Sequence, residues 1–319
     1  MQLEALVAVE TRPGSGSGPG MWRQENRGRH LQERVVKIVL AACAYLSIFT
    51  TFGIVFVLLF ETISFFTQVS ILDFFTDTRW AASFANPSFG IMVLASGTLM
   101  TTLIAILIAL PIGLLAAIYL SEYASTRLRR WLKPALEILA GVPTIVYGYF
   151  ALTFVTPLLR ATIFPDMTIF NVLSAGIVMG VMIIPTIASV SEDAIYAVPR
   201  SLREGAYALG ATKRETATKI VVPAALSGIV AATILGISRA VGETMIVAVA
   251  AGNLAQFCVN PLQPCQTMTA FIVQVASGDT QTGSLTFQTI FAVGSTLFLM
   301  TLVLNVISYI FVRRFREAY

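Results

Sequence analysis

The stretch that decides the fold is "VPRSLREGAYALGATKRETATKIVVP", Val198–Pro223, a charged segment between two apolar ones. Within it, Ser201–Glu204 has the spacing of a capping box, which predicts the start of a short helix. Gly210 stands just past that helix, where a left-handed residue is favoured. Thr212–Glu215 repeats the capping spacing and predicts a second helix, which Pro223 ends or joins to the next segment. The segment is therefore expected to form a helix–glycine–helix elbow.

Outside the elbow, the composition is that of a membrane protein. Of 319 residues, 56% are hydrophobic and only 12% are charged, which excludes an ordinary soluble domain. Six runs are long enough to cross a bilayer, which takes about 20 apolar residues. We therefore predict an all-α fold, a polytopic membrane helix bundle of six transmembrane helices. They are Ile38–Phe60, Ile91–Leu120, Ala135–Leu158, Val172–Val190, Ala224–Ala251 and Phe287–Val312.

The basic residues predict the orientation of the chain. Eighteen of the 21 Lys and Arg residues lie before the first run, after the second, after the fourth or after the sixth. Because cytoplasmic segments are enriched in Lys and Arg, both termini and the elbow are expected in the cytoplasm. The predicted organisation is a disordered tail over 1–34, a first transmembrane helix with an external loop over 35–90, and a core over 91–319 that contains the elbow, 198–223.

The cysteines and the histidine limit the possible chemistry. Cys258 and Cys265 share the external loop "NLAQFCVNPLQPCQ", where a disulfide and two free thiols are both open possibilities. His30 is the only histidine, and no His/Cys cluster has the spacing of metal ligands. We expect no metal site.

The elbow resembles the EAA loop of ATP-binding-cassette (ABC) importer permeases. The pattern of that loop is E-A-A, three residues, G, nine residues, I, one residue, L-P. Two positions depart from it, with Gly205 for Ala and Val222 for Leu. The resemblance implies a type I importer permease of the MetI-like fold, whose elbow docks on an ATPase subunit. The alternative is that the segment is only a well-capped cytoplasmic helical hairpin, without a docking role. The matching residues are Glu204, Gly205, Ala206, Gly210, Ile220 and Pro223.

The elbow does not contain an ATP site of its own. Gly205 and Gly210 have the spacing of P-loop glycines, but Ala211 stands where the lysine is needed. The segment also follows a membrane span rather than a strand. We therefore expect no enzyme active site and no cofactor in this chain, with ATP and Mg²⁺ bound by a partner ATPase.

From about Phe89 to the C-terminus, the chain looks like phosphate-importer permeases of the PstC type. The resemblance lies in "LKPALEILAGVPTIVYGYFAL" (132–152), "IIPTIASVSEDAIYAVPRSLREGA" (183–206) and "GISRAVGETM" (236–245). It implies a bacterial plasma (inner) membrane protein in contact with lipid, with no nucleic acid as partner. The implied partners are a paralogous PstA-type permease, a homodimeric PstB-type ATPase, an external PstS-type phosphate-binding protein and inorganic phosphate.

Two charges interrupt the fifth run. In a continuous helix, Arg239 and Glu243 lie at i and i+4 on one face, in a stripe with Gly228, Ala232 and Gly236 that can line a path or pack closely. One interpretation is an ion pair that locks helices. The other is a substrate path, because the planar guanidinium fits phosphate. In that case Glu243 takes back the guanidinium after release, or accepts a hydrogen bond from protonated phosphate.

Other polar side chains in the apolar runs are weaker candidates for the same path. A threonine in a membrane helix usually bonds its own backbone, so these residues rank below Arg239. Glu137 is expected to be solvated or paired with Lys133. The candidates are Thr98, Thr101 and Thr102 in the second run, Thr144 and Tyr147 after Pro143, and Thr186 and Ser189 after Pro185.

Three alternative functions stay open. A permease for another oxyanion, such as molybdate or sulfate, would have the same architecture. A secondary anion transporter or channel would need no docking elbow and often shows inverted repeats. A membrane enzyme would need a nucleophile–base or metal constellation, which the sequence does not offer.

Overall fold

The computed structural model describes residues 27–82 and 86–315, in which the secondary structure is helical apart from one isolated bridge between Trp80 and Phe89. Two compact units divide the chain at residues 56 and 57. Helix α1, Arg27–Phe66, begins in the first unit and ends in the second. The predicted disordered tail lies outside the described residues up to residue 26. Residues 27–34, which were also predicted to belong to that tail, lie in α1, where Leu31, Gln32 and Glu33 are good helix formers.

The predicted all-α membrane bundle is confirmed. Five helices are long and apolar enough to cross a membrane, and a sixth span results if one bent pair is counted as a span. Four predicted spans correspond to single long helices, each somewhat longer than its apolar run. These are α1, α3 (Ile91–Ile118, continued by the π-helix η1, Tyr119–Tyr123), α7 (Val172–Tyr196) and α13 (Leu285–Phe315).

The third predicted span is not one continuous helix. Helix α4, Thr126–Ala140, ends at Gly141, and Pro143 precedes the next helix. Proline lacks an N–H donor and disfavours helical backbone before it, which explains the break. The chain then continues as α5 (Thr144–Phe150), the π-helix η2 (Ala151–Val155) and α6 (Thr156–Thr162).

The fifth predicted span is interrupted twice. Lys213–Ala224 and Leu226–Val241 meet at an angle of 71°, next to Pro223, which cannot donate a helical hydrogen bond. The chain leaves helix again at Gly242–Thr244 and resumes as a short helical segment from Met245. The elements are α9 (Lys213–Thr216), η3 (Ala217–Val221), α10 (Val222–Ala224), α11 (Leu226–Val241) and η4 (Val247–Ala251), followed by α12 (Met268–Ser277).

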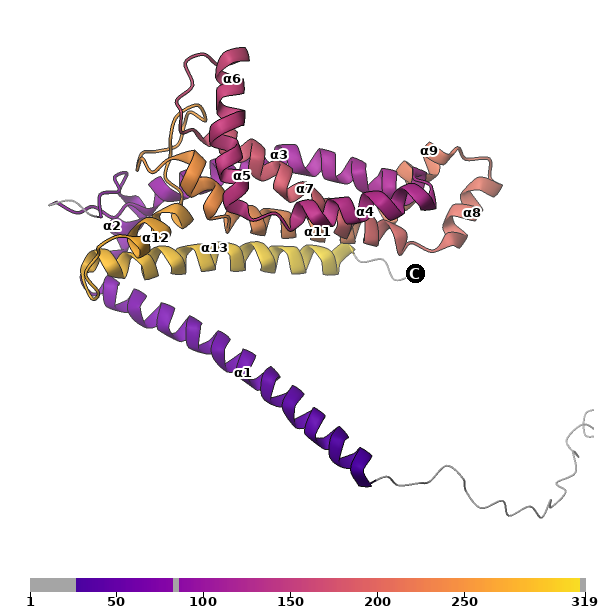
Figure 1. Cartoon of the computed structure of the whole chain (residues 1–319), viewed down its shortest axis with the longest axis horizontal. Coiled ribbons are helices and arrows are strands. Elements are labelled where there is room, and N and C mark those ends of the chain that lie inside the picture. The colour runs from indigo at the N-terminus through magenta and orange to yellow at the C-terminus, as the bar shows by residue number, and fades with distance from the viewer. Residues whose placement is uncertain (1–26, 83–85, 316–319) are drawn as a thin grey trace, which may run out of the picture. The chain divides into compact units, whose positions relative to one another are not determined.

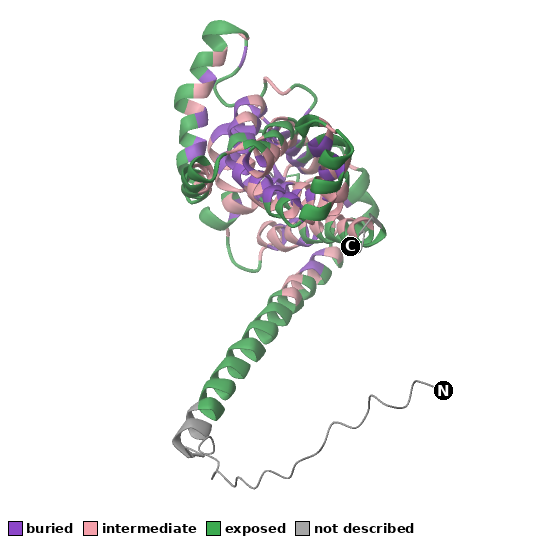
Figure 2. Ribbon diagram, turned by 90° about the vertical axis from the view of Figure 1, so that its right-hand side faces the viewer, coloured by how far each residue is buried: buried purple, intermediate pink, exposed green. Residues whose placement is uncertain are grey.

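Helix α7 is the centre of the 57–319 unit. In its most apolar window, 67% of the residues are buried, against 28% or less in the other candidate spans. It packs against α3, α4 and α11 (Figure 1), and the buried residues gather in the middle of the bundle (Figure 2). Small residues permit the close approach: an added Cβ at Gly228 of α11 would overlap Ala194, and one at Gly236 would lie 3.0 Å from Ile187. The predicted small-residue stripe therefore packs against α7.

Candidate functional site

The elbow predicted from the sequence lies at one end of the bundle, with α8, Arg200–Ala208, leading to α9 (Figure 1). Its turn depends on Gly210, whose φ is +83°. The N–H of Gly210 donates to Tyr207 O at 3.0 Å, and the N–H of Ala211 donates to Ala206 O at 3.0 Å. These two bonds form a Schellman motif, which satisfies carbonyls at the end of a helix. The predicted helix–glycine–helix elbow is confirmed.

Of the two predicted capping boxes, one is confirmed and one is wrong. Thr212 Oγ1 accepts from Glu215 N at 3.3 Å, and Glu215 Oε2 accepts from Thr212 N at 3.1 Å. Ser201, in contrast, lies inside α8, because the helix begins one residue earlier with Pro199 as its N-cap. The extended backbone of Pro199, with φ −55° and ψ 138°, lets the helix begin directly after it. It therefore displaces the expected serine cap.

The EAA-like residues divide into an exposed and a buried group. Glu204 and Gly205 are exposed on α8, whereas Ala206 is buried against the bundle. Leu209, at the tip, is 91% exposed. Farther along, Ile220 is half-buried and Pro223 is exposed. Leu209 therefore stands in solvent at the tip of a turn that Gly210 fixes.

Arg203 fastens the elbow to two helices of the bundle. Its Nε and Nη2 donate to Glu122 Oε1 of η1 at 3.2 and 2.9 Å. Its Nη2 also donates to Ile195 O of α7 at 2.8 Å, and its Nη1 donates to Val198 O at 2.5 Å. This cluster was not predicted from the sequence. The signal for it was an acidic residue just after the second run and an arginine in the segment that follows the fourth run.

A second ionic cluster ties α4 to α7 and was also missed. The Glu192 side chain is only 1% exposed and pairs with Arg129 and, at 2.8 Å, with Lys133. Lys133 also bonds Asp193 at 2.8 Å. Glu137, which was expected to be solvated or paired with Lys133, is exposed on α4, and Lys133 pairs with two carboxylates of α7 instead. Hydrogen bonds to Asp193 and then Glu192 raise the pKa of the Lys133 ammonium above its ordinary value.

Arg239 lies in the last turn of α11 and points its guanidinium at α7. Nη1 donates to Thr186 Oγ1 at 2.7 Å, and Nη2 lies 3.8 Å from Met182 Sδ. The residue is half-buried. Thr186 was predicted near Arg239, whereas Met182 was not. A partly exposed guanidinium held by a neutral hydroxyl keeps its charge available to an anion.

Glu243 does not occupy the position that the sequence predicted. The helix ends at Val241, so Arg239 and Glu243 are not one turn apart on one face, and the ion pairs among the described residues do not join them. Glu243 Oε1 instead accepts from Met245 N at 3.1 Å and Ile246 N at 3.3 Å. A carboxylate that satisfies free N–H groups stabilises the start of a helical segment, and this local bond outweighs the expected pair.

Two of the other predicted path residues, Thr98 and Thr101, lie away from Arg239. The carbonyl of Thr101 packs against Gly176 of α7. Thr186, the residue that binds Arg239, lies ten residues after Gly176 on the same helix, which places it about 15 Å farther along the helix axis. Thr98 Oγ1 accepts from Met268 N at 3.0 Å, and Thr101 donates to Gly97 O at 2.9 Å, so both have structural bonds.

Of the remaining polar candidates, Tyr147 lies close enough to Arg239 for the two groups to interact electrostatically. Thr102 is buried and makes no hydrogen bond within the part of the chain described. Tyr147 donates to Leu139 O at 2.7 Å across the α4–α5 break. Thr144, at the start of α5, and Ser189 of α7 are half-buried. Their roles in transport stay predictions.

Comparison with known proteins shows the family. Residues 109–317 match the family described as "Binding-protein-dependent transport system inner membrane component". The chain belongs to this family of transport components. Members of this family are inner-membrane components of transport systems. In such a system the permease generally works with a further permease, an ATPase and a substrate-binding protein.

Several named permease proteins are similar in sequence to this transport component. It is 34% identical over 90% of its length, and 94% of the relative, to a probable ABC transporter permease protein, YqgH, of Bacillus subtilis. It is 37% identical over 64% of its length, and 68% of the relative, to the phosphate transport system permease protein PstC of Xylella fastidiosa. It is 34% identical over 76% of its length, and 78% of the relative, to PstC of Mesorhizobium japonicum.

Solved structures confirm the importer-permease fold of this transport component. A chain of a bacterial alginate ABC transporter, in complex with an alginate-pentasaccharide-bound periplasmic protein, is similar with a TM-score of 0.62 over 90% of this chain and 98% of that one, at 14% identity. A chain of the MetNI methionine ABC transporter in an inward-facing conformation is similar with a TM-score of 0.52 over 72% and 95%, at 21% identity. The MetI-like fold predicted from the elbow is thereby confirmed.

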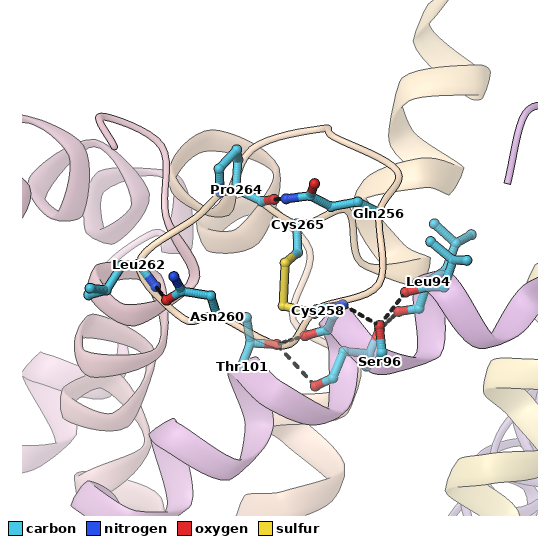
Figure 3. Close-up of a disulfide and its surroundings, with 12 residues drawn as sticks. Leu94, Ser96, Thr101, Gln256, Cys258, Asn260, Leu262, Pro264 and Cys265 are labelled. Atoms are coloured by element: carbon cyan, nitrogen blue, oxygen red, sulfur yellow. Dashed lines mark hydrogen bonds between the residues drawn. A yellow bond between two sulfur atoms is a disulfide. The ribbon is translucent and has the colours of Figure 1, made fainter. Parts of the chain in front are cut away.

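At the other end of this transport component, Cys258 and Cys265 are joined by a disulfide, with their Cα atoms 5.8 Å apart (Figure 3). The loop is pinned to α3 because Cys258 N donates to Ser96 Oγ at 2.9 Å, and it is closed by Gln256 Nε2 donating to Pro264 O at 2.9 Å. Of the two possibilities that the sequence left open, the structure has the disulfide.

Proposed function

We propose that this chain is the PstC-type permease subunit of an ATP-driven phosphate importer in a bacterial plasma membrane. The observation that supports phosphate as the substrate is the 32–37% identity to PstC proteins of several bacteria and an archaeon, over 64–77% of the chain. The capped elbow with the exposed Leu209 supports coupling to a separate ATPase. The proposed partners are a PstA-type permease, a homodimeric PstB-type ATPase that binds ATP and Mg²⁺, and a PstS-type external phosphate-binding protein.

The proposed orientation places both termini and the elbow in the cytoplasm. The start of α4, the elbow and the end of α13 lie at the same end of the 57–319 unit (Figure 1). These three segments carry most of the basic residues of that unit, which supports the positive-inside assignment. The disulfide-bonded loop then faces the external side, where disulfides persist.

We propose that Arg239 is the group that meets phosphate in the membrane. A buried cation in a membrane helix is costly and usually faces a path or a partner group. Here the bonded neighbour is the neutral Thr186, and phosphate oxygens are stronger acceptors than a hydroxyl. Phosphate therefore exchanges with Thr186 at the guanidinium, and Thr186 takes the guanidinium back after release, the role first expected of Glu243.

Glu243 has a different proposed role from a counter-ion. Its Oε1 holds the start of the short helical segment from Met245. Its other carboxylate oxygen is the atom that we propose to accept a hydrogen bond from protonated phosphate. Sulfate has no proton to offer near neutral pH, so this bond favours phosphate.

The experiment that tests the function as an importer subunit is purification of the tagged chain from membranes in mild detergent. We expect a second permease and a P-loop ATPase to copurify, whereas a secondary transporter or channel would purify without an ATPase. Arg239→Gln and Arg239→Lys should retain both partners and lose phosphate uptake, since neither reproduces the planar, charged fork. Uptake at the normal rate by Arg239→Gln would refute the proposed path.

A further inference from the structure

Arg203 joins three parts of the chain that the proposed cycle must move together. It lies on α8 of the elbow, and its acceptors are Glu122 of η1 and the carbonyls of Ile195 and Val198 at the end of α7. η1 directly continues α3. Helices α3 and α7, which share the most extensive helix–helix contact of the bundle, therefore both end at the guanidinium of Arg203. The side chains of Arg203 and Glu122 are 16% and 6% exposed.

The chemistry of this contact requires arginine. A guanidinium presents five donors in a rigid plane, whereas an ammonium is a compact point charge on a flexible stem. Here three guanidinium nitrogens reach one carboxylate oxygen and two carbonyl oxygens at fixed positions. A lysine can hold one of these partners well but not all of them. Because the pair is largely desolvated, loss of either partner leaves a charge without its match.

The two helices that Arg203 holds form one closely packed body, because their backbones are in close contact. An added Cβ at Gly180 of α7 would lie 2.9 Å from Ala105 O, and one at Gly113 of α3 would lie 3.0 Å from Ile187. Interfaces packed so closely do not deform continuously. Thr186, which holds Arg239, lies on α7 within this body.

We propose that Arg203 is the positioning residue that transmits displacement of the elbow to the joined α3–α7 pair, and through Thr186 to Arg239. The proposal rests on the proposed docking of the elbow on an ATPase. Arg203 touches neither nucleotide nor substrate. Its bonds to Glu122 and to the end of α7 turn a local push on α8 into a movement of the membrane helices.

The test uses Arg203→Lys and Glu122→Gln in the complete transporter, in proteoliposomes with the external binding protein. The matched controls are Arg130→Lys and Glu137→Gln, which make the same changes at exposed positions of α4. Docking is read separately, by a photo-crosslinking amino acid in place of Leu209, and ATP hydrolysis is measured with and without the loaded binding protein.

We expect both variants to crosslink to the ATPase and to hydrolyse ATP at the basal rate, but to lose about tenfold or more of the stimulation by the loaded binding protein, within the usual range of allosteric coupling. Phosphate uptake should fall in parallel, and the controls should match the unaltered protein. The double variant should be no worse than the poorer single variant, because both changes break one contact.

Three results would overturn the proposal. Normal stimulation in both variants would show that the contact carries no coupling. Loss of the Leu209 crosslink together with stimulation would show that Arg203 only shapes the docking surface. Losses that multiply in the double variant would show that the two residues act independently. Absence of the crosslink in the unaltered protein would instead refute elbow docking itself, so the two failures are distinguishable.

Discussion

Replacing Gly210 by valine tests whether the turn of the elbow is required for coupling. The φ of +83° is a region that L-residues avoid, and a β-branched side chain avoids it most. Among the described residues, no atom beyond the two chain neighbours lies within 4 Å of a Cβ added there, so the penalty is in the backbone, about 1–3 kcal/mol. At about 2 kcal/mol, the ratio of native to rearranged elbow falls by roughly 30-fold, while the membrane helices keep their contacts.

The assay compares Gly210→Val with Gly210→Asn, since asparagine tolerates the left-handed region far better than valine. We expect both proteins to insert into the membrane. The valine variant should lose the copurifying ATPase or its phosphate-stimulated hydrolysis, and the asparagine variant should keep most of both. Equal, unimpaired stimulation in the two variants would refute the reasoning that the left-handed turn positions the elbow for docking.

Three other predictions concern the ionic cluster and the disulfide. Arg129→Gln combined with Lys133→Gln should lower the free energy of unfolding by about 3–5 kcal/mol, because Glu192 is left buried without a partner. Glu192→Gln should lower it by only about 1–3 kcal/mol. Equal shifts of the thermal unfolding midpoint in the two variants would contradict this reasoning. Since the pKa of Lys133 is raised on folding, the stabilisation that Lys133 gives the folded protein should be complete below the ordinary lysine pKa. It should be lost as pH rises through the raised pKa. A difference in stability between the native protein and Lys133→Met that varies between pH 6 and 9 would contradict this prediction. Serine at both Cys258 and Cys265, a separation of 7 residues, should cost about 2–3 kcal/mol of local stability, seen as faster hydrogen exchange in that loop; alkylation of both cysteines without reduction would show that the bond is absent.

The sequence predicted the features that depend on neighbours along the chain. Gly210 and the Thr212–Glu215 capping box are local, and their chemistry determines the turn. Ser201 failed for a local reason too, because Pro199 competes as the start of the same helix. The prediction of a continuous fifth span was wrong because it extended the helical periodicity through Gly242. Beyond that residue, Glu243 satisfies two backbone N–H groups instead of facing Arg239.

The contacts between distant helices were beyond sequence reasoning. Glu122 and Arg203 are 81 residues apart, and Arg129 and Glu192 are 63 apart. Each of these residues alone has the appearance of a solvated charge at the end of a span. Only the packing of α3 and α4 on α7 brings the partners together. The same holds for Thr186, which was predicted as a path residue and proves to be the residue that holds Arg239.

The most direct test of the central claim is uptake of labelled phosphate by the reconstituted complex of this chain with its permease, ATPase and external binding protein. The account predicts uptake that requires ATP, stops when Arg239 is replaced by glutamine, and is not displaced by excess sulfate or molybdate. Uptake of sulfate or molybdate in place of phosphate, or phosphate uptake that proceeds without ATP, would contradict the account.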